Sequence, residues 1–140
     1  MHAADYKHWN LSLDGDQIAW LLIDRDSEST NTLGQEVMAE LDAILDKLTQ
    51  DTPRGLVIMS AKSTGFIAGA DIREFEGYDN VAEVTELVKN GHAVFAKLEN
   101  LKCPTVAAVS GFCLGGGYEL ALCCNSVSYT HLTLPTTPYV

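Results

Sequence analysis

Residues 110–122 have the sequence SGFCLGGGYELAL, which joins an apolar run at 105–109 to a second apolar segment. Three consecutive glycines, Gly115 to Gly117, occupy the junction. Glycine is needed where the backbone takes a positive φ or approaches a ligand, and a helix that begins there presents free N–H groups and the positive end of its dipole. The segment therefore predicts a strand, a glycine turn and a short buried helix, with a candidate oxyanion site at the turn.

The glycine turn also has a purely structural explanation, which is close packing of the helix on the strand. Phosphate-binding motifs do not fit, because Gly111-x-x-x-Gly115 is not followed by Lys-Ser/Thr and the G-x-G-x-x-G spacing is absent. Packing and oxyanion binding both remain open at this point.

A second glycine loop, GFIAGADI at 65–72, follows an apolar run expected to form a buried strand at 55–61. Because open α/β folds gather ligand sites at the carboxyl ends of their strands, the two loops can converge. The amides of Ala70 and Gly116 then form a candidate pair of oxyanion donors. We expect Asp71 to be a helix cap or a loop anchor.

Glu119 lies in the first turn of the predicted short helix and is the only formally charged residue after Lys102. One explanation is favourable contact with the helix dipole. The other is a general acid or base near the oxyanion site, with a pKa tuned by partial burial. The residues alone do not choose between them.

The strands expected elsewhere give an α/β order. Alternation at 9–13 and an apolar run at 18–23 flank the turn Asp14-Gly15-Asp16, which predicts a β-hairpin. Further strands are expected at 55–61 and 105–109. With the helices below, the predicted order is strand, strand, helix, strand, helix, strand.

Two long amphipathic helices complete the pattern. Apolar residues recur at helical spacing from 33 to 48, with Thr30 or Asn31 as the expected N-cap. A second helix is expected at 84–101, interrupted by Gly91.

Composition narrows the possible classes of protein. The 140 residues are 46% hydrophobic, which suits one domain or part of one. Nineteen acidic and nine basic residues give a net charge of −10, which argues against a nucleic-acid or anionic-membrane surface. The N-terminus lacks the pattern of a secretory signal, and no apolar run approaches the ~18 residues of a membrane span. We expect a soluble cytoplasmic protein.

The cysteines and histidines give no sign of a metal centre. The four cysteines lie in apolar surroundings without C-x-x-C spacing, so buried free thiols are expected. The histidines are scattered with no ligand spacing, so we expect no metal site. These residues are Cys103, Cys113, Cys123, Cys124, His2, His8, His92 and His131.

Taken together, FIAGADI at 66–72 and AAVSGFCLGGGYELAL at 107–122 resemble the two signature segments of the enoyl-CoA hydratase/isomerase, or crotonase, family. The similarity runs from about Trp9 to Asn125. The segment GFIAGADIREF at 65–75 is most similar to the hydratase part of the multifunctional α subunit of fatty-acid oxidation. The resemblance implies an α/β crotonase-like spiral of ββα units, here truncated.

The resemblance also implies an activity, enoyl-CoA hydratase of fatty-acid β-oxidation, which adds water to trans-2-enoyl-CoA. In that chemistry the amides of Ala70 and Gly116 would bind the thioester carbonyl, and Glu119 would be one of two catalytic glutamates. The other substrate-binding positions implied are Ala68, Asp71, Ile72 and Gly115.

The implied ligands and partners follow from that activity. Hydration needs no cofactor, coenzyme A enters as part of the acyl-CoA thioester substrate, and NAD is expected only if the parent protein carries a dehydrogenase domain. A thiolase subunit and a homo-oligomer are expected partners of the full-length parent.

The end of the chain departs from the family pattern. From Leu120 to Val140 there is no Asp or Glu to serve as the second glutamate, and SVSYTHLTLPTTPYV at 126–140 does not resemble the family's next strand. We expect residues 1–125 to be the amino-terminal part of a crotonase domain and 126–140 to be aberrant, without stable packed structure.

The missing glutamate keeps other functions open. One is a Δ3-Δ2-enoyl-CoA isomerase that uses a single carboxylate as a proton shuttle. The others are a non-catalytic acyl-CoA binding module and an inert fragment.

Overall fold

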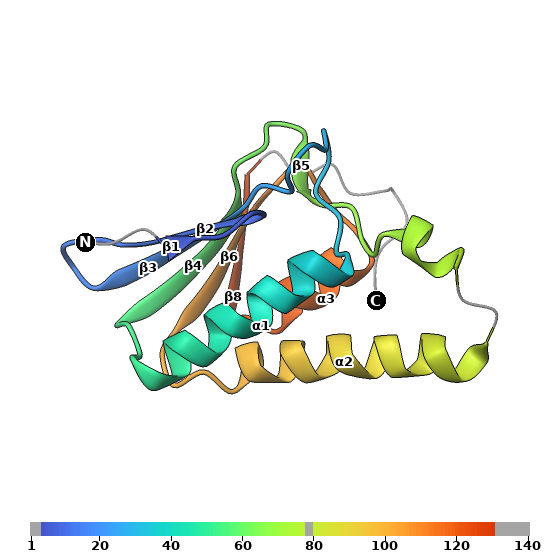
Figure 1. The fold of residues 1–140 in the computed structure, drawn as a ribbon. Coiled ribbons are helices and arrows are strands. Elements are labelled where there is room, and N and C mark those ends of the chain that lie inside the picture. The colour runs from blue at the N-terminus through green and yellow to red at the C-terminus, as the bar shows by residue number, and fades with distance from the viewer. Residues whose placement is uncertain (1–3, 78–79, 131–140) are drawn as a thin grey trace.

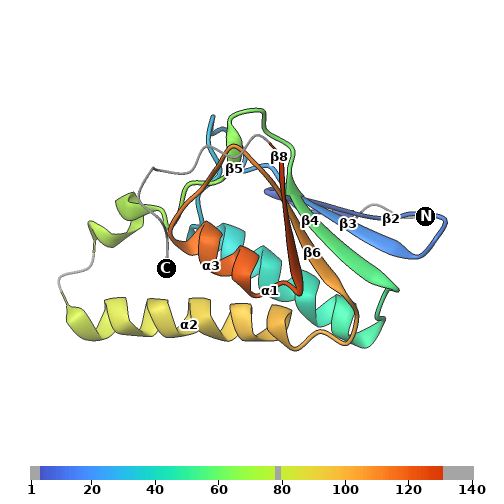
Figure 2. The same cartoon turned by 180° about the vertical axis from the view of Figure 1, so that it is seen from behind.

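A computed structural model describes residues 4–77 and 80–130 of the chain. A six-stranded sheet forms one layer, and the helices lie together on one side of it (Figures 1 and 2). The strand order across the sheet is β1-β2-β3-β4-β6-β8. The strands are β1 (Ala4–Asp5), β2 (Trp9–Leu13), β3 (Ile18–Ile23), β4 (Gly55–Ser60), β6 (Thr105–Ser110) and β8 (Ser126–Thr130).

The predicted hairpin is confirmed. β2 and β3 pair antiparallel from Trp9–Ile23 to Leu13–Ala19, and the turn is held by Asp14, whose carboxylate accepts hydrogen bonds from the Asp16 and Ile18 amides. From β3 onward the neighbouring strands β4, β6 and β8 all pair in parallel. The carboxyl ends of these strands therefore meet at one edge of the sheet.

Two short strands lie inside the glycine loops and were not predicted from the sequence. β5 (Gly65–Ile67) and β7 (Phe112–Cys113) pair in parallel as a small second sheet. Each is too short for a hydrophobic period to be recognised. Their pairing brings the two glycine loops side by side.

The helices follow the strands in a repeating order. They are α1 (Gln35–Gln50), the 3-10 helix η1 (Ile72–Phe75), α2 (Val81–Glu99) and α3 (Gly116–Leu122). Each unit contributes two strands and a helix, as β2-β3-α1, β4-β5-α2 and β6-β7-α3, which confirms the predicted spiral of ββα units. None of the helices formed by the described residues combines the length and apolar character that crossing a bilayer requires.

Two details of the predicted helices are wrong. α1 begins at Gln35, and the Glu74 carboxylate of η1, not Thr30 or Asn31, accepts the Gln35 amide hydrogen bond at 2.9 Å. Asn31 is fully buried instead. α2 runs through Gly91 without interruption, because a single glycine costs only about 1 kcal/mol in a helix.

The core lies between the sheet and α1. The buried face of α1 carries Val37, Leu41, Ile44, Leu45 and Leu48. Burying each such side chain contributes roughly 1.5–3 kcal/mol, so this packing is the main force that seats α1 on the sheet. α2 is joined to α1 at its surface by Lys97, whose Nζ lies 2.6 Å from Asp42 and 2.9 Å from Asp46.

The expectation that residues 126–140 lack packed structure is wrong for the first five. Ser126–Thr130 form β8, which pairs in parallel with β6 from Val106–Ser126 to Ser110–Thr130. Only Val127 of this strand is half-buried, and its other residues are exposed. The rest of the predicted tail, 131–140, lies outside the described residues.

Candidate active site

Two glycine-bearing loops form the site, and we name them the Ala70 loop (residues 66–71) and the Gly116 turn (residues 113–117). The Leu114 amide donates to the Ile67 carbonyl at 3.0 Å, which continues the β5–β7 pairing into the loops. A glycine in the left-handed region precedes each expected donor, with φ of 118° at Gly69 and 52° at Gly115. L-residues with side chains adopt these angles only with strain.

The expected donor amides lie near each other. A Cβ added at Gly116 would be 3.9 Å from the Ala70 nitrogen, and one added at Gly69 would be 3.9 Å from the Gly116 nitrogen. The Leu33 amide donates to the Gly69 carbonyl and the Asp71 amide donates to the Leu33 carbonyl, so the Ala70 amide between them is turned away from Leu33. Within residues 4–77 and 80–130, neither donor amide is hydrogen-bonded. Both are available to a ligand oxygen.

A cavity of about 990 Å³ opens in front of these amides. Its volume is at the upper end of ligand pockets, and its wall combines apolar side chains with carboxylates. Four of the expected site residues line it, namely Ala70, Asp71, Gly116 and Glu119. The other three, Ala68, Ile72 and Gly115, are not part of the cavity wall, and the Ile72 side chain is 76% exposed.

Glu119 stands in the first turn of α3, where its own amide donates to the Gly115 carbonyl at 3.0 Å. Its side chain is 57% exposed, which is more than the expected partial burial. His92 of α2 faces it across the cavity, with Nε2 4.0 Å from Oε2. No local sequence pattern predicts this pair, because its two residues lie on different helices that only folding brings together.

Asp71 is the loop anchor and helix cap that the sequence predicted. It is 5% exposed, it caps η1 by accepting the Arg73 amide hydrogen bond, and its carboxylate also binds the side chains of Arg73 and Arg25. Hydrogen bonds from Arg73, with a further one from Arg25, lower its pKa from 3.8 to about 2 against the opposing effect of burial. The carboxylate is therefore ionised throughout the neutral range.

The four cysteines are free thiols, as predicted. Three are buried and Cys123 is half-buried. Burial raises the pKa of Cys113 and of Cys124 to about 11, so both are protonated at neutral pH. They are packing residues.

The fold and this site define a class, the α/β proteins built of ββα units in which two backbone amides from neighbouring loops face a cavity. A solved enoyl-CoA hydratase/carnithine racemase from Magnetospirillum magneticum shares the fold, with a TM-score of 0.82 at 24% identity over 91% of this chain and 47% of that one. An enoyl-CoA hydratase from Bacillus anthracis has a TM-score of 0.77 at 26% identity over 87% of this chain and 47% of that one.

Comparison of sequences, unlike that of structures, identifies the family of the chain. The profile of the enoyl-CoA hydratase/isomerase family matches residues 16–130, and the chain belongs to that family. It is 42% identical to the fatty acid oxidation complex subunit alpha of Shewanella halifaxensis and 43% identical to that of Shewanella frigidimarina. These matches cover 85% of this chain but only 17% of each relative. The predicted likeness to the α subunit is confirmed. The match to the family profile extends past Asn125 to residue 130.

Proposed function

We propose that the protein containing this chain is an enoyl-CoA hydratase of fatty-acid β-oxidation and that the Ala70 loop, the Gly116 turn and Glu119 form its active site. The observation that carries the proposal is the meeting of two unpaired amides and one carboxylate at a single cavity. The named relatives, which are fatty acid oxidation complex α subunits, support the same pathway.

The proposed chemistry is addition of water to a trans-2-enoyl-CoA. Glu119 accepts a proton from water as the water oxygen bonds to C3 of the thioester. The electron pair of the double bond then moves toward the carbonyl, and the resulting enolate oxygen is held by the Ala70 and Gly116 amides. Transfer of that proton from Glu119 to C2 restores the thioester, gives the 3-hydroxyacyl-CoA and returns Glu119 to its carboxylate form.

The net charge of −10 does not conflict with an anionic substrate. The thioester end would be bound by backbone N–H groups, which act at hydrogen-bond range whatever the net charge of the protein. The substrate-contact roles of Ala68, Ile72 and Gly115 are part of the proposal, as contacts outside the cavity wall. Hydration itself needs no cofactor, and we propose that any use of NAD belongs to a separate domain.

A second activity is favoured by one observation. The chain supplies no Asp or Glu between Leu120 and Val140, and one carboxylate suffices to move a proton between two carbons of a 3-enoyl-CoA. Isomerisation to the 2-enoyl-CoA is therefore the alternative. In either case we propose a cytoplasmic enzyme that, at full length, forms a homo-oligomer and associates with a thiolase subunit.

The test uses the uninterrupted protein that contains this segment, because the chain spans only 47% of the hydratase structures above. Hydration of crotonyl-CoA is measured for the wild type and for Glu119→Gln. We expect kcat to fall about 10²–10⁴-fold in the variant. Glu83→Gln is the matched control, since Glu83 lines the same cavity from α2, and it should leave kcat close to that of the wild type.

Each other outcome has a definite meaning. Conversion of a 3-enoyl-CoA without hydration would replace the hydratase with the isomerase. Tight binding of crotonyl-CoA without turnover would indicate a binding module, and neither binding nor turnover would indicate an inert fragment. Full activity in Glu119→Gln would remove Glu119 from the mechanism.

A further inference from the structure

The Ala70 loop is held from one side by the segment that links β3 to α1. The Ala68 amide donates to the Asn31 carbonyl at 2.8 Å, and the Leu33 amide donates to the Gly69 carbonyl at 2.8 Å. The Asp71 amide returns a hydrogen bond to the Leu33 carbonyl at 3.2 Å. The position of the Ala70 amide therefore depends on the placement of residues 24–33.

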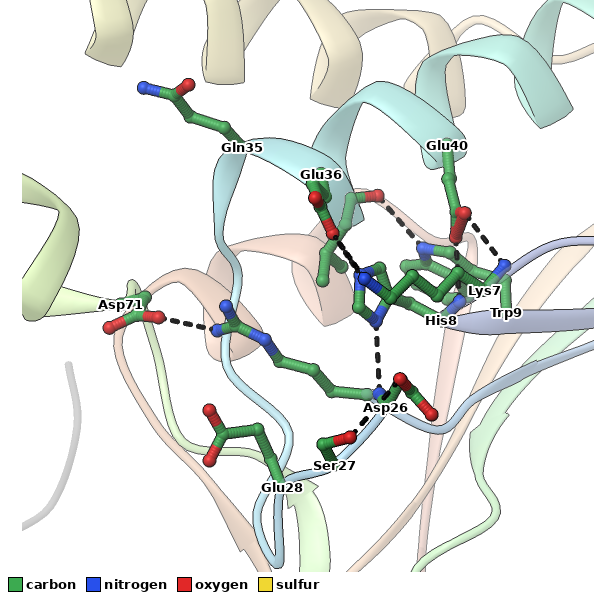
Figure 3. A network of polar contacts seen from close by, with 12 residues as sticks. Lys7, His8, Trp9, Asp26, Ser27, Glu28, Gln35, Glu36, Glu40 and Asp71 are labelled. Atoms are coloured by element: carbon green, nitrogen blue, oxygen red, sulfur yellow. Dashed lines mark hydrogen bonds and ion pairs between the residues drawn. The ribbon is translucent and has the colours of Figure 1, made fainter.

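This linking segment is itself fixed by a buried histidine. His8 is 4% exposed, its Nδ1 accepts the Asp26 amide hydrogen bond at 3.0 Å and its Nε2 lies 2.9 Å from the Glu36 carboxylate of α1. The Asp24 amide also donates to the His8 carbonyl. Figure 3 shows His8 between Glu36 of α1 and Asp26, with Asp71 on the far left of the network. The segment is thus attached to both β2 and α1.

Arg25 extends from the fixed segment to the loop. Its amide donates to the Asn31 Oδ1 at 2.9 Å, and its Nη1 lies 2.8 Å from the Asp71 Oδ2. The Arg25 side chain is 14% exposed and the Asp71 side chain 5%. Water screens such a pair weakly, so its geometry is well defined.

Arg73 binds the same carboxylate, but through a much more exposed contact than that of Arg25. Its side chain is 59% exposed, so its ion pair is screened by water. It also lies two residues after Asp71, and its own contact with the linking segment is an ion pair with Glu28 at 2.7 Å, between side chains that are 59% and 32% exposed and therefore screened by water. Arg25 comes from a different part of the fold and can fix the loop relative to the sheet.

We propose that Arg25 is a positioning residue for the reaction, which holds the Ala70 amide in place through its ion pair with Asp71. The inference rests on the proposed function. Arg25 is not among the residues that line the cavity, so it acts through Asp71 and not by contact with the substrate. Loss of the pair would let the peptide before Asp71 tilt, and small displacements of an oxyanion donor reduce the rate of the chemical step more than substrate binding.

The experiment compares Arg25→Met, Arg25→Lys and Arg73→Met in the uninterrupted protein. We expect Arg25→Met to lower kcat for crotonyl-CoA by about 10–100-fold while KM changes much less. Arg25→Lys should recover part of the loss, because an ammonium can make one of the contacts with Asp71. Arg73→Met, the matched control, should remain close to the wild type.

A readout independent of turnover separates the two proposals. Hydrogen exchange of a peptide covering 66–72 reports on the Ala68 and Asp71 amides, which are bonded to the linking segment, and it should be faster in Arg25→Met than in Arg73→Met. Faster exchange with an inactive wild type would support the anchor and reject the hydratase. An active wild type with equal kcat and exchange in both arginine variants would overturn the role of Arg25. If Arg25→Met does not fold, Arg25→Lys alone is the test. Its ammonium is expected to bind Asp71 more weakly than the guanidinium does, so a kcat and an exchange rate equal to those of the wild type would overturn the role of Arg25.

Discussion

The two donor loops of the site have the same backbone design but different supports. In both, a glycine with positive φ precedes the donor amide. The Ala70 loop is then held by polar side chains from elsewhere in the chain, chiefly Asn31 and Arg25. The Gly116 turn leads directly into α3 and is held by packing, with Gly117 and Leu120 buried. One donor therefore depends on a hydrogen-bond network and the other on steric fit.

The largest expected effect tests the polar support. Asn31 is fully buried, its Nδ2 donates to the Ser60 hydroxyl and the Phe66 carbonyl at 2.9 Å each, and its Oδ1 accepts the Arg25 amide hydrogen bond at 2.9 Å. Asn31→Ala removes these bonds and should lower the free energy of unfolding by roughly 3 kcal/mol, at about 1 kcal/mol for each bond. Urea denaturation measures the change.

The control for that change is Asn80→Ala, which removes an exposed asparagine that caps α2 through the Ala82 amide. A loss of only about 1 kcal/mol is expected there. Equal losses in the two variants would mean that the Asn31 network does not support the Ala70 loop in the way described.

A somewhat smaller effect tests the steric support. A Cβ at Gly117 would lie 2.5 Å from the Ile67 Cβ and 2.7 Å from the Ile67 carbonyl oxygen. Gly117→Ala should therefore destabilise the protein by about 1–3 kcal/mol through overpacking. Gly91→Ala in α2 is the matched control, because an added Cβ there meets nothing within 4 Å, and it should stabilise by about 0.5–1 kcal/mol. Denaturation midpoints that move in the same direction would contradict the steric account.

The smallest expected effect is a change in pH dependence. The Asp71 pKa is lowered from 3.8 to about 2, so its stabilising contribution is complete above about pH 4 and is lost as the pH falls through 2. Asp71→Asn has no such titration. The unfolding free energy of the wild type should therefore fall more steeply between about pH 4 and pH 2 than that of the variant. Parallel curves would show that the Asp71 carboxylate is not held by its arginines.

The contrast between the loops also shows what the sequence can predict. The hairpin, both long helices, the two glycine loops and Glu119 all follow from local patterns such as period, turn residues and glycine runs. The helix that follows the Gly116 turn is also predicted locally, because it begins within the quoted segment 110–122, but its steric partner Ile67 lies in the other loop.

The remaining features depend on residues far apart in the chain. Arg25 reaches Asp71 across 46 positions of sequence, and Glu74 caps a helix that begins at Gln35. His92 meets Glu119 only because α2 and α3 share a cavity wall. No local pattern marks such partners. β8 was missed for a related reason, since its order comes from pairing with β6 and hardly from burial of its own side chains.

The central claim is that the Ala70 and Gly116 amides polarise a thioester carbonyl. Infrared spectroscopy of carbonyl-labelled crotonyl-CoA, bound to the uninterrupted protein with Glu119→Gln to prevent turnover, measures this polarisation directly. Gly116→Pro removes one donor N–H at the first position of α3, where proline is tolerated, and Gly116→Ala keeps it. We predict a carbonyl stretch shifted to lower frequency on binding, retained in Gly116→Ala and diminished in Gly116→Pro. An unshifted carbonyl, or the same shift in both variants, would contradict the oxyanion site.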